Sequence, residues 1–205
     1  TAGSRARVKG HIASPASRLS PLTSFNGVVT ATVNDAEETI VCKLNDESKD
    51  GASTPFEYKD RTKTIYNGSD SIRNGAFTLT FAVPKDISYT DGTGLLTLYA
   101  VDDTNALTAH GENEGFVLNG SSIVGNDSIG PSIYCYLNTT SFTNGDKVNA
   151  KPYFVAELYD DDGINASGSG IGHDLELIID GELSKTYNLN SYFAYDFGDY
   201  RSGRI

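Results

Sequence analysis

Apolar and polar residues alternate along several short stretches of this chain, and this alternation predicts β-strands. The clearest case is 76–83, where one face of the predicted strand carries Phe77, Leu79, Phe81 and Val83. Pro84 should end this strand, because proline cannot donate a hydrogen bond to a sheet. No segment shows a convincing apolar period of 3.6 residues. The pattern therefore predicts an all-β fold.

Further strands are predicted where β-branched and aromatic residues cluster between turn residues. They cover 5–12, 28–33, 39–44, 56–59, 63–66, 94–101, 131–137, 151–158, 175–179 and 185–188, and a strand begins near 200–205. We expect 14–24 to be a loop and 39–44 to be the hairpin partner of 28–33. Asn67-Gly68, Asn74-Gly75 and Asp180-Gly181 are expected to form turns.

The spacing of the turn signals, roughly 8–12 residues, predicts β-sandwiches. A stretch rich in Asn, Gly and Ser begins at Asn119 and predicts a linker. We therefore expect a β-sandwich domain at 1–120, a linker at 121–130 and an immunoglobulin-like β-sandwich domain at 131–205. The second domain is shorter than the roughly 100 residues of a seven-stranded sandwich. We expect it to be incomplete at its C-terminus, with one or two strands missing.

Charge and hydropathy restrict the partners of this chain. Its 205 residues carry a formal net charge of −11, which opposes binding to nucleic acid and to anionic membrane surfaces. No stretch approaches the roughly 18 apolar residues of a transmembrane span. The chain lacks Met and starts at Thr1 without a signal-peptide pattern, so we expect a fragment or a processed form.

The cysteine and histidine residues do not form a recognisable catalytic pair. Cys42 and Cys135 both fall in predicted strands, and we expect two unpaired thiols, although a bridge between the domains is the alternative. His11, His110 and His173 lie in no motif that would position a base beside a thiolate. We therefore assign no catalytic residue to this chain and expect it not to be an enzyme by itself.

The most polar loop of the chain, Asp160-Asp161-Asp162-Gly163, is the first candidate binding site. Carboxylates beside a glycine turn are common ligands of Ca²⁺, but the spacing departs from the EF-hand pattern. The alternative is a solvated loop whose Asp side chains accept hydrogen bonds from local backbone N–H groups. We predict no permanently bound metal and no other cofactor.

The residues that follow this acidic loop extend the candidate site. His173-Asp174 lies at the entrance of a predicted strand and either fixes the loop by hydrogen bonds or contacts a partner. The glycine-rich run 168–172 lacks the following helix of a phosphate-binding loop, so we interpret it as turn geometry. The predicted contact residues are Asp160, Asp161, Asp162, Asn165, His173 and Asp174.

Aromatic side chains are concentrated near the end of the chain. They are Tyr187, Tyr192, Phe193, Tyr195, Phe197 and Tyr200. They either pack in the core and along its edge or form a platform for a carbohydrate or a peptide.

Several short motifs occur together in an order that resembles one family. They are Phe25-Asn26-Gly27, 72–77, 81–87, 98–100, 129–131, 141–145, 162–165, 172–174 and 179–181. Over most of its length the chain resembles the β-rich C-terminal region of PorU-like proteins. These are gingipain-type cysteine peptidases that act as the sortase of the type IX secretion system.

This resemblance implies an accessory region of a larger enzyme. The parent protein would carry the catalytic cysteine and histidine in an upstream domain that is absent here. The implied partners are the parent peptidase domain and secreted cargo or other secretion-system proteins. The implied location is the cell surface, at the outer membrane of a Gram-negative bacterium of the Bacteroidetes. The alternatives are a stand-alone secreted adhesin or glycan- or protein-binding module, and a structural spacer.

Overall fold

The computed structural model describes residues 1–43, 55–120, 129–168 and 174–205. Regular structure in these residues consists of strands and two three-residue 3-10 helices, η1 (Leu183–Lys185) and η2 (Asn190–Tyr192). The all-β prediction is confirmed. Among the same residues there is no helix that is both long and apolar enough to cross a membrane.

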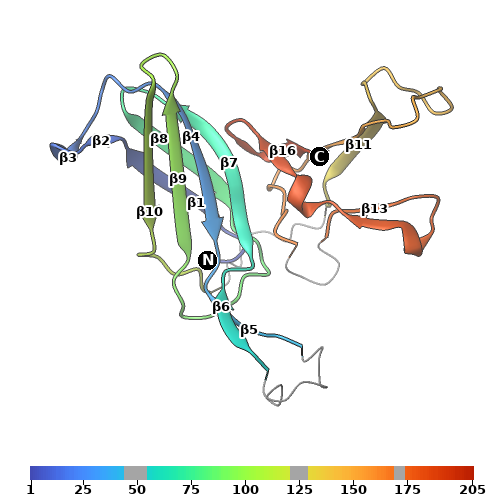
Figure 1. Ribbon diagram of the computed structural model, residues 1–205, viewed down its shortest axis with the longest axis horizontal. Helices are drawn as coiled ribbons and strands as arrows, with labels where there is room; N and C mark the ends of the chain where they lie inside the picture. The colour runs from blue at the N-terminus through green and yellow to red at the C-terminus, as the bar shows by residue number, and fades with distance from the viewer. Residues whose placement is uncertain (44–54, 121–128, 169–173) are drawn as a thin grey trace.

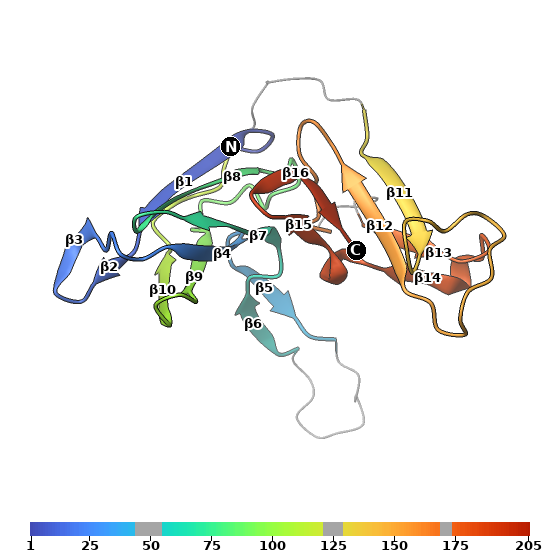
Figure 2. The ribbon, with the colours of Figure 1, turned by 90° about the horizontal axis from the view of Figure 1, so that it is seen from above.

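The described residues of the first half of the chain, 1–43 and 55–120, form two facing sheets and two small hairpins (Figures 1 and 2). Its strands are β1 (Arg5–His11), β2 (Ala13–Ser14), β3 (Ser17–Pro21), β4 (Gly27–Asn34), β5 (Glu38–Val41), β6 (Glu57–Asp60), β7 (Thr64–Ile72), β8 (Ala76–Ala82), β9 (Leu95–Asp102) and β10 (Leu107–Asn113). The larger sheet has the order β10-β9-β4-β7, and the smaller one pairs β1 with β8; every pairing is antiparallel.

The two sheets of the first half enclose one hydrophobic core. On β4, Val29, Ala31 and Val33 are buried, while the residues that alternate with them are exposed or partly exposed. On β8, Phe77, Leu79 and Phe81 are buried and belong to the same cluster as the β4 residues. The alternation predicted for 76–83 therefore marks a true core face, and its period of two matches the pleat of a strand.

One of the two predicted Asn-Gly turns of the first half is confirmed and the other is wrong. Asn74 and Gly75 join β7 to β8 with φ values of 50° and 74°, the left-handed conformation that a tight hairpin needs. Asn67-Gly68 instead lies inside β7, where Gly68 pairs with Ala31 of β4. A side chain at Gly68 would overlap the Tyr66 ring, so this glycine provides space for an aromatic side chain.

The predicted strand partners in the first half need two corrections. The segment 14–24, expected to be a loop, contains most of a small hairpin formed by β2 and β3. The strand expected at 39–44 forms β5 but pairs with β6 rather than with β4. Both edges of β4 are occupied by β7 and β9, so β5 projects away from the sheets with β6 (Figures 1 and 2).

The strand β10 was missed because its sequence carries little apolar signal. Its residues are mostly exposed, since β10 is an edge strand of the larger sheet. An exposed edge strand does not need the alternation that a half-buried strand requires.

A buried carboxylate connects the start of β4 to the end of β9, at one end of the larger sheet. Asp102, at the end of β9, is 0% exposed. It accepts hydrogen bonds from Asn105 Nδ2 at 2.7 Å and from the backbone N–H of Asn26 at 2.9 Å. These bonds, from the Asn105 side chain first and then from the Asn26 backbone, hold the pKa of Asp102 below its ordinary value.

We expect Asp102→Asn to destabilise the fold at pH 7, because the replacement carries no charge to strengthen these hydrogen bonds. The folded pKa is lowered, so the unfolded state binds more protons as the pH falls below about 4. The contribution of the carboxylate is complete above that pH and is lost as the pH falls through the folded pKa. Urea unfolding at pH 7 and pH 3 should show a gap between wild type and variant that narrows at pH 3; an equal gap would contradict this role.

The second half of the described chain, 129–205, forms another four-stranded sheet and a hairpin. Its strands are β11 (Ser132–Leu137), β12 (Phe154–Tyr159), β13 (Glu176–Ile178), β14 (Thr186–Asn188), β15 (Ala194–Asp196) and β16 (Asp199–Arg204). The sheet has the order β11-β12-β16-β15, and β13 pairs with β14. The turn predicted at Asp180-Gly181 is confirmed, with φ values of 56° and 71°.

The strand that was expected to begin near the end of the chain is present as β16, and it lies inside the sheet between β12 and β15. The strand β15 was missed in the sequence. A small core formed by Ala156, Leu158 and Ile164 lies beneath this sheet.

The two halves meet through aromatic side chains. The ring of Tyr195 on β15 lies 5.1 Å from the Tyr66 ring on β7 and 4.9 Å from the Phe193 ring, measured between centroids. Tyr66 in turn stacks on Phe81 of β8 at 4.9 Å. These four rings form a continuous row, the aromatic junction, that joins the two cores. Burial raises the pKa of Tyr66 to about 12, so its hydroxyl stays neutral at physiological pH.

Candidate functional site

The three consecutive aspartates of the acidic loop form a turn at the end of β12. Asp160 Oδ1 accepts a hydrogen bond from the backbone N–H of Asp162 at 2.8 Å. Asp161 Oδ1 accepts one from the hydroxyl of Tyr159 at 2.7 Å. These contacts fit the solvated-loop hypothesis, in which the Asp side chains accept local hydrogen bonds rather than ligate Ca²⁺.

The other predicted contact residues do not join these aspartates in one described site. Asn165 Nδ2 donates to Asp86 Oδ1 at 3.1 Å, so it connects the second half to the loop after β8. Asp174 is exposed, next to the start of β13. His173 and most of the glycine-rich run lie outside the described residues. A contact role for these residues stays a prediction.

Within the described parts of the chain, no group of three or more His, Cys, Asp or Glu side chains is arranged to hold a metal ion. The geometry of the three aspartates does not by itself create a cation site. The expectation of no bound cofactor, with Ca²⁺ at this loop as the alternative, stays a prediction.

Neither cysteine forms a disulfide, as expected. Cys42 follows β5 rather than lying in it, and Cys135 is exposed on β11. Desolvation raises the pKa of the Cys135 thiol above its ordinary value. A nucleophilic cysteine needs the opposite shift, because the thiolate is the reactive form.

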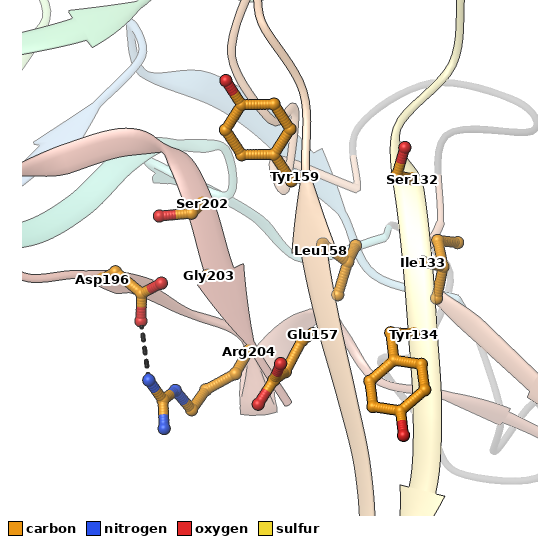
Figure 3. A pocket seen from close by; sticks show the side chains of 10 residues that line it. All are labelled: Ser132, Ile133, Tyr134, Glu157, Leu158, Tyr159, Asp196, Ser202, Gly203 and Arg204. Atoms are coloured by element: carbon orange, nitrogen blue, oxygen red, sulfur yellow. Dashed lines mark hydrogen bonds and ion pairs between the residues drawn. The ribbon is translucent and has the colours of Figure 1, made fainter. Parts of the chain in front are cut away.

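A hollow on one face of the β11-β12-β16-β15 sheet is a site that the sequence reasoning did not identify (Figure 3). Its volume is about 360 Å³. The side chains that define it are Tyr134, Glu157, Tyr159, Asp196, Ser202 and Arg204. Figure 3 shows the two tyrosines standing apart on β11 and β12, with the charged side chains grouped at β12, β15 and β16. We call this site the outer-face hollow.

The sheet register explains why these residues share one face. Tyr134 lies opposite Glu157, and Glu157 lies opposite Arg204. In the next row on this face, Tyr159 lies opposite Ser202. Directly opposed residues in antiparallel strands project to the same side of a sheet, so segments far apart in the sequence meet here.

The charged groups of the outer-face hollow are held by specific partners. Arg204 Nη2 lies 3.1 Å from Asp196 Oδ1, and this hydrogen bond raises the pKa of the guanidinium. Glu157 Oε1 accepts a hydrogen bond from the Tyr136 hydroxyl at 2.9 Å, which raises the pKa of Tyr136. Both interactions fix the direction of the carboxylates before any ligand binds.

A smaller cavity of about 150 Å³ lies beside the aromatic junction. It is lined by residues of β7, by Ala166 of the loop after β12 and by the segment around η2, including Asn190 and Tyr195. Asn190 Oδ1 accepts from the backbone N–H of Leu175 at 3.0 Å, and its Nδ2 donates to the Ala166 carbonyl at 3.3 Å. Through these two hydrogen bonds, Asn190 connects the segment at Leu175 to the loop at Ala166.

The aromatic residues near the end of the chain separate into two groups. Phe193 and Tyr195 pack against the cores, and Tyr200 packs against the first core. Tyr187, Tyr192 and Phe197 are exposed. The exposed tyrosines of the hollow, Tyr134 and Tyr159, are not part of this run, and a short-range pattern gave no signal for them.

Comparison with solved structures relates this chain to a known protein. The solved structure of dimeric latent PorU from Porphyromonas gingivalis is similar to this chain, with a TM-score of 0.59 and 32% sequence identity. The match covers 100% of this chain and 19% of the PorU chain. No protein-family model matches the chain, and no curated protein matches it. The comparison supports a PorU-like relation over the whole chain and leaves most of PorU unmatched.

Proposed function

We propose that this chain is a non-catalytic β-sandwich region, near the C-terminus, of a gingipain-family cysteine peptidase that acts as a type IX secretion sortase. The observation that carries the proposal is the match to PorU along the full length of this chain. The match covers 19% of the PorU chain, which leaves room for a separate peptidase domain in the parent protein. The region would support the catalytic domain and contact cargo or secretion partners at the outer membrane surface.

The proposal includes two β-sandwich domains, at 1–120 and 131–205, joined by a linker at 121–130. The facing sheets and shared core of the first half support the first domain. In the second half, the order β11-β12-β16-β15 corresponds to the order A-B-E-D of an immunoglobulin sheet. On this correspondence β13 and β14 are the start of the opposite sheet.

Further strands would then complete the second domain by covering the face of the sheet that carries Ile133 and Cys135. Ile133, on the same side of the sheet as the buried Leu158, is 60% exposed. Cys135 lies on that side and is also exposed. Apolar side chains on an inner sheet face are normally covered by the second sheet of a sandwich. This exposure supports an incomplete immunoglobulin-like domain.

The contacts between the halves support a scaffolding role. The backbone N–H of Gly198 donates to the Ser69 carbonyl at 2.8 Å, beside the aromatic junction. The guanidinium of Arg5 lies 5.6 Å from the centre of the Tyr200 ring, within the range of a cation–π contact. Connections of this kind fix the angle between two units, as a platform for a larger enzyme requires.

The experiment is an in-frame deletion, in the parent gene, of the segment that encodes residues 1–205 of this chain. It is made in the bacterium that carries this gene. A variant of the catalytic cysteine in the same gene provides the reference. We expect both strains to accumulate cargo that retains its C-terminal sorting domain, as measured by mass spectrometry of surface and secreted proteins. Normal cargo processing in the deletion strain would refute the proposal. An open reading frame without a peptidase domain would also refute it and would favour a secreted adhesin or binding module.

A further inference from the structure

We propose that the outer-face hollow binds a neutral oligosaccharide. This inference goes beyond the accessory role and does not depend on it, because it rests on the side chains of the hollow alone (Figure 3). A volume of about 360 Å³ places the hollow in the size range of small-ligand sites.

The hollow offers two exposed aromatic surfaces. Tyr134 is 50% exposed and Tyr159 is 43% exposed. Each hydroxyl is held in place: Tyr134 donates to the Thr140 carbonyl at 3.2 Å, and Tyr159 donates to Asp161 at 2.7 Å. Fixed tyrosine rings provide large amphipathic contact area at a low cost in conformational entropy. The C–H faces of a sugar ring are a suitable partner for such surfaces.

The charged groups of the hollow select against anionic ligands. Asp196, Arg204 and Glu157 bring two carboxylates and one guanidinium into the hollow. The two carboxylates would repel a phosphate or a carboxylate ligand. The ion pair at 3.1 Å between Arg204 and Asp196 cancels one charge of each sign, so no cationic side chain among the described residues that line the hollow remains free to attract an anion.

The same groups match the hydrogen-bonding chemistry of a polyol. Carboxylate oxygens accept hydrogen bonds, whereas a guanidinium only donates them. A sugar hydroxyl donates and accepts, so neighbouring hydroxyls can satisfy Glu157 and Arg204 at the same time. Because these side chains are already oriented by Tyr136 and Asp196, binding would cost little side-chain ordering.

The test begins with the purified full chain on an array of neutral and acidic oligosaccharides and lysine- or arginine-containing peptides. The best neutral ligand is then titrated by saturation-transfer difference NMR. We expect binding confined to neutral oligosaccharides, with saturation transferred from tyrosine rings. Tyr134→Ala and Glu157→Gln should each weaken binding about tenfold, since each removes one principal contact.

Two controls keep this test specific. Glu157→Gln preserves the side-chain shape, so it separates ligand binding from loss of fold if Tyr134→Ala unfolds. Tyr192→Ala removes an exposed tyrosine outside the hollow and should leave binding unchanged. Absence of neutral ligands, binding of only charged ligands, or equal loss in the Tyr192 variant would each overturn the proposal.

Discussion

Leu79→Ala should lower the free energy of unfolding by about 2–5 kcal/mol, the range for truncating a leucine in a packed core. Leu79 is 1% exposed and lies at the centre of β8, opposite Val8 of β1. Its side chain belongs to the core that the two sheets of the first half share. The surrounding strands are paired and cannot collapse freely into the space that is left. Urea unfolding at pH 7, followed by circular dichroism, measures the change.

The matched control for this variant is Thr80→Ala. Thr80 is the next residue of β8, and its side chain projects from the other face of the strand, where it is partly exposed. We expect a change of about 0.5 kcal/mol or less, as for surface positions in general. Similar losses in the two variants would mean that the alternation along β8 does not separate a core face from an outer face.

Tyr195→Ala should destabilise the chain by about 3–5 kcal/mol, the range for removing a large aromatic ring from a packed site. Its ring touches the Tyr66 and Phe193 rings, and its hydroxyl donates to the Ile164 carbonyl at 2.6 Å. Removing the ring interrupts the aromatic junction between the two cores. The second half has the smaller core, so it should lose more of its protection. Hydrogen exchange followed by mass spectrometry should show that the variant exchanges faster than wild type, and that the increase in rate is larger in β12 and β16 than in β4 and β9.

Tyr195→Phe separates the ring from its hydroxyl. It keeps the aromatic contacts and removes one hydrogen bond, so we expect a loss of about 1 kcal/mol and preserved coupling between the halves. Uniform acceleration of exchange across both halves in Tyr195→Ala would contradict the junction model. Equal losses in the two variants would assign the stabilisation to the hydroxyl rather than to the ring.

The two candidate sites differ in how clearly the sequence marks them. Asp160, Asp161 and Asp162 stand out in the sequence because they are adjacent and polar, and the structure places them in a turn with local hydrogen bonds. The outer-face hollow has no comparable local signal. Its residues come from β11, β12, β15 and β16, and each segment alone resembles an ordinary strand. The hollow exists because the register sets Tyr134, Glu157 and Arg204 in one row.

The sequence by itself determined the fold class, most of the strands and the core face of β8. These features depend on the period of two in the polypeptide backbone, which is visible within a few residues. It also determined the tight turn at Asn74-Gly75, since few residue pairs adopt two consecutive positive φ values. The resemblance carried by scattered motifs agrees with the similarity to PorU along the whole chain.

Only the tertiary structure decided which strands pair and which surfaces meet. Asn67-Gly68 has the composition of a turn, yet the ladder between β4 and β7 keeps it extended. β5 follows β4 in the chain and could have formed a hairpin with it, but β7 and β9 occupy both edges of β4. Pairing depends on contacts between residues that are distant in the chain, and the free energy of those contacts overrides local preference. The aromatic junction and the outer-face hollow are consequences of these long-range choices.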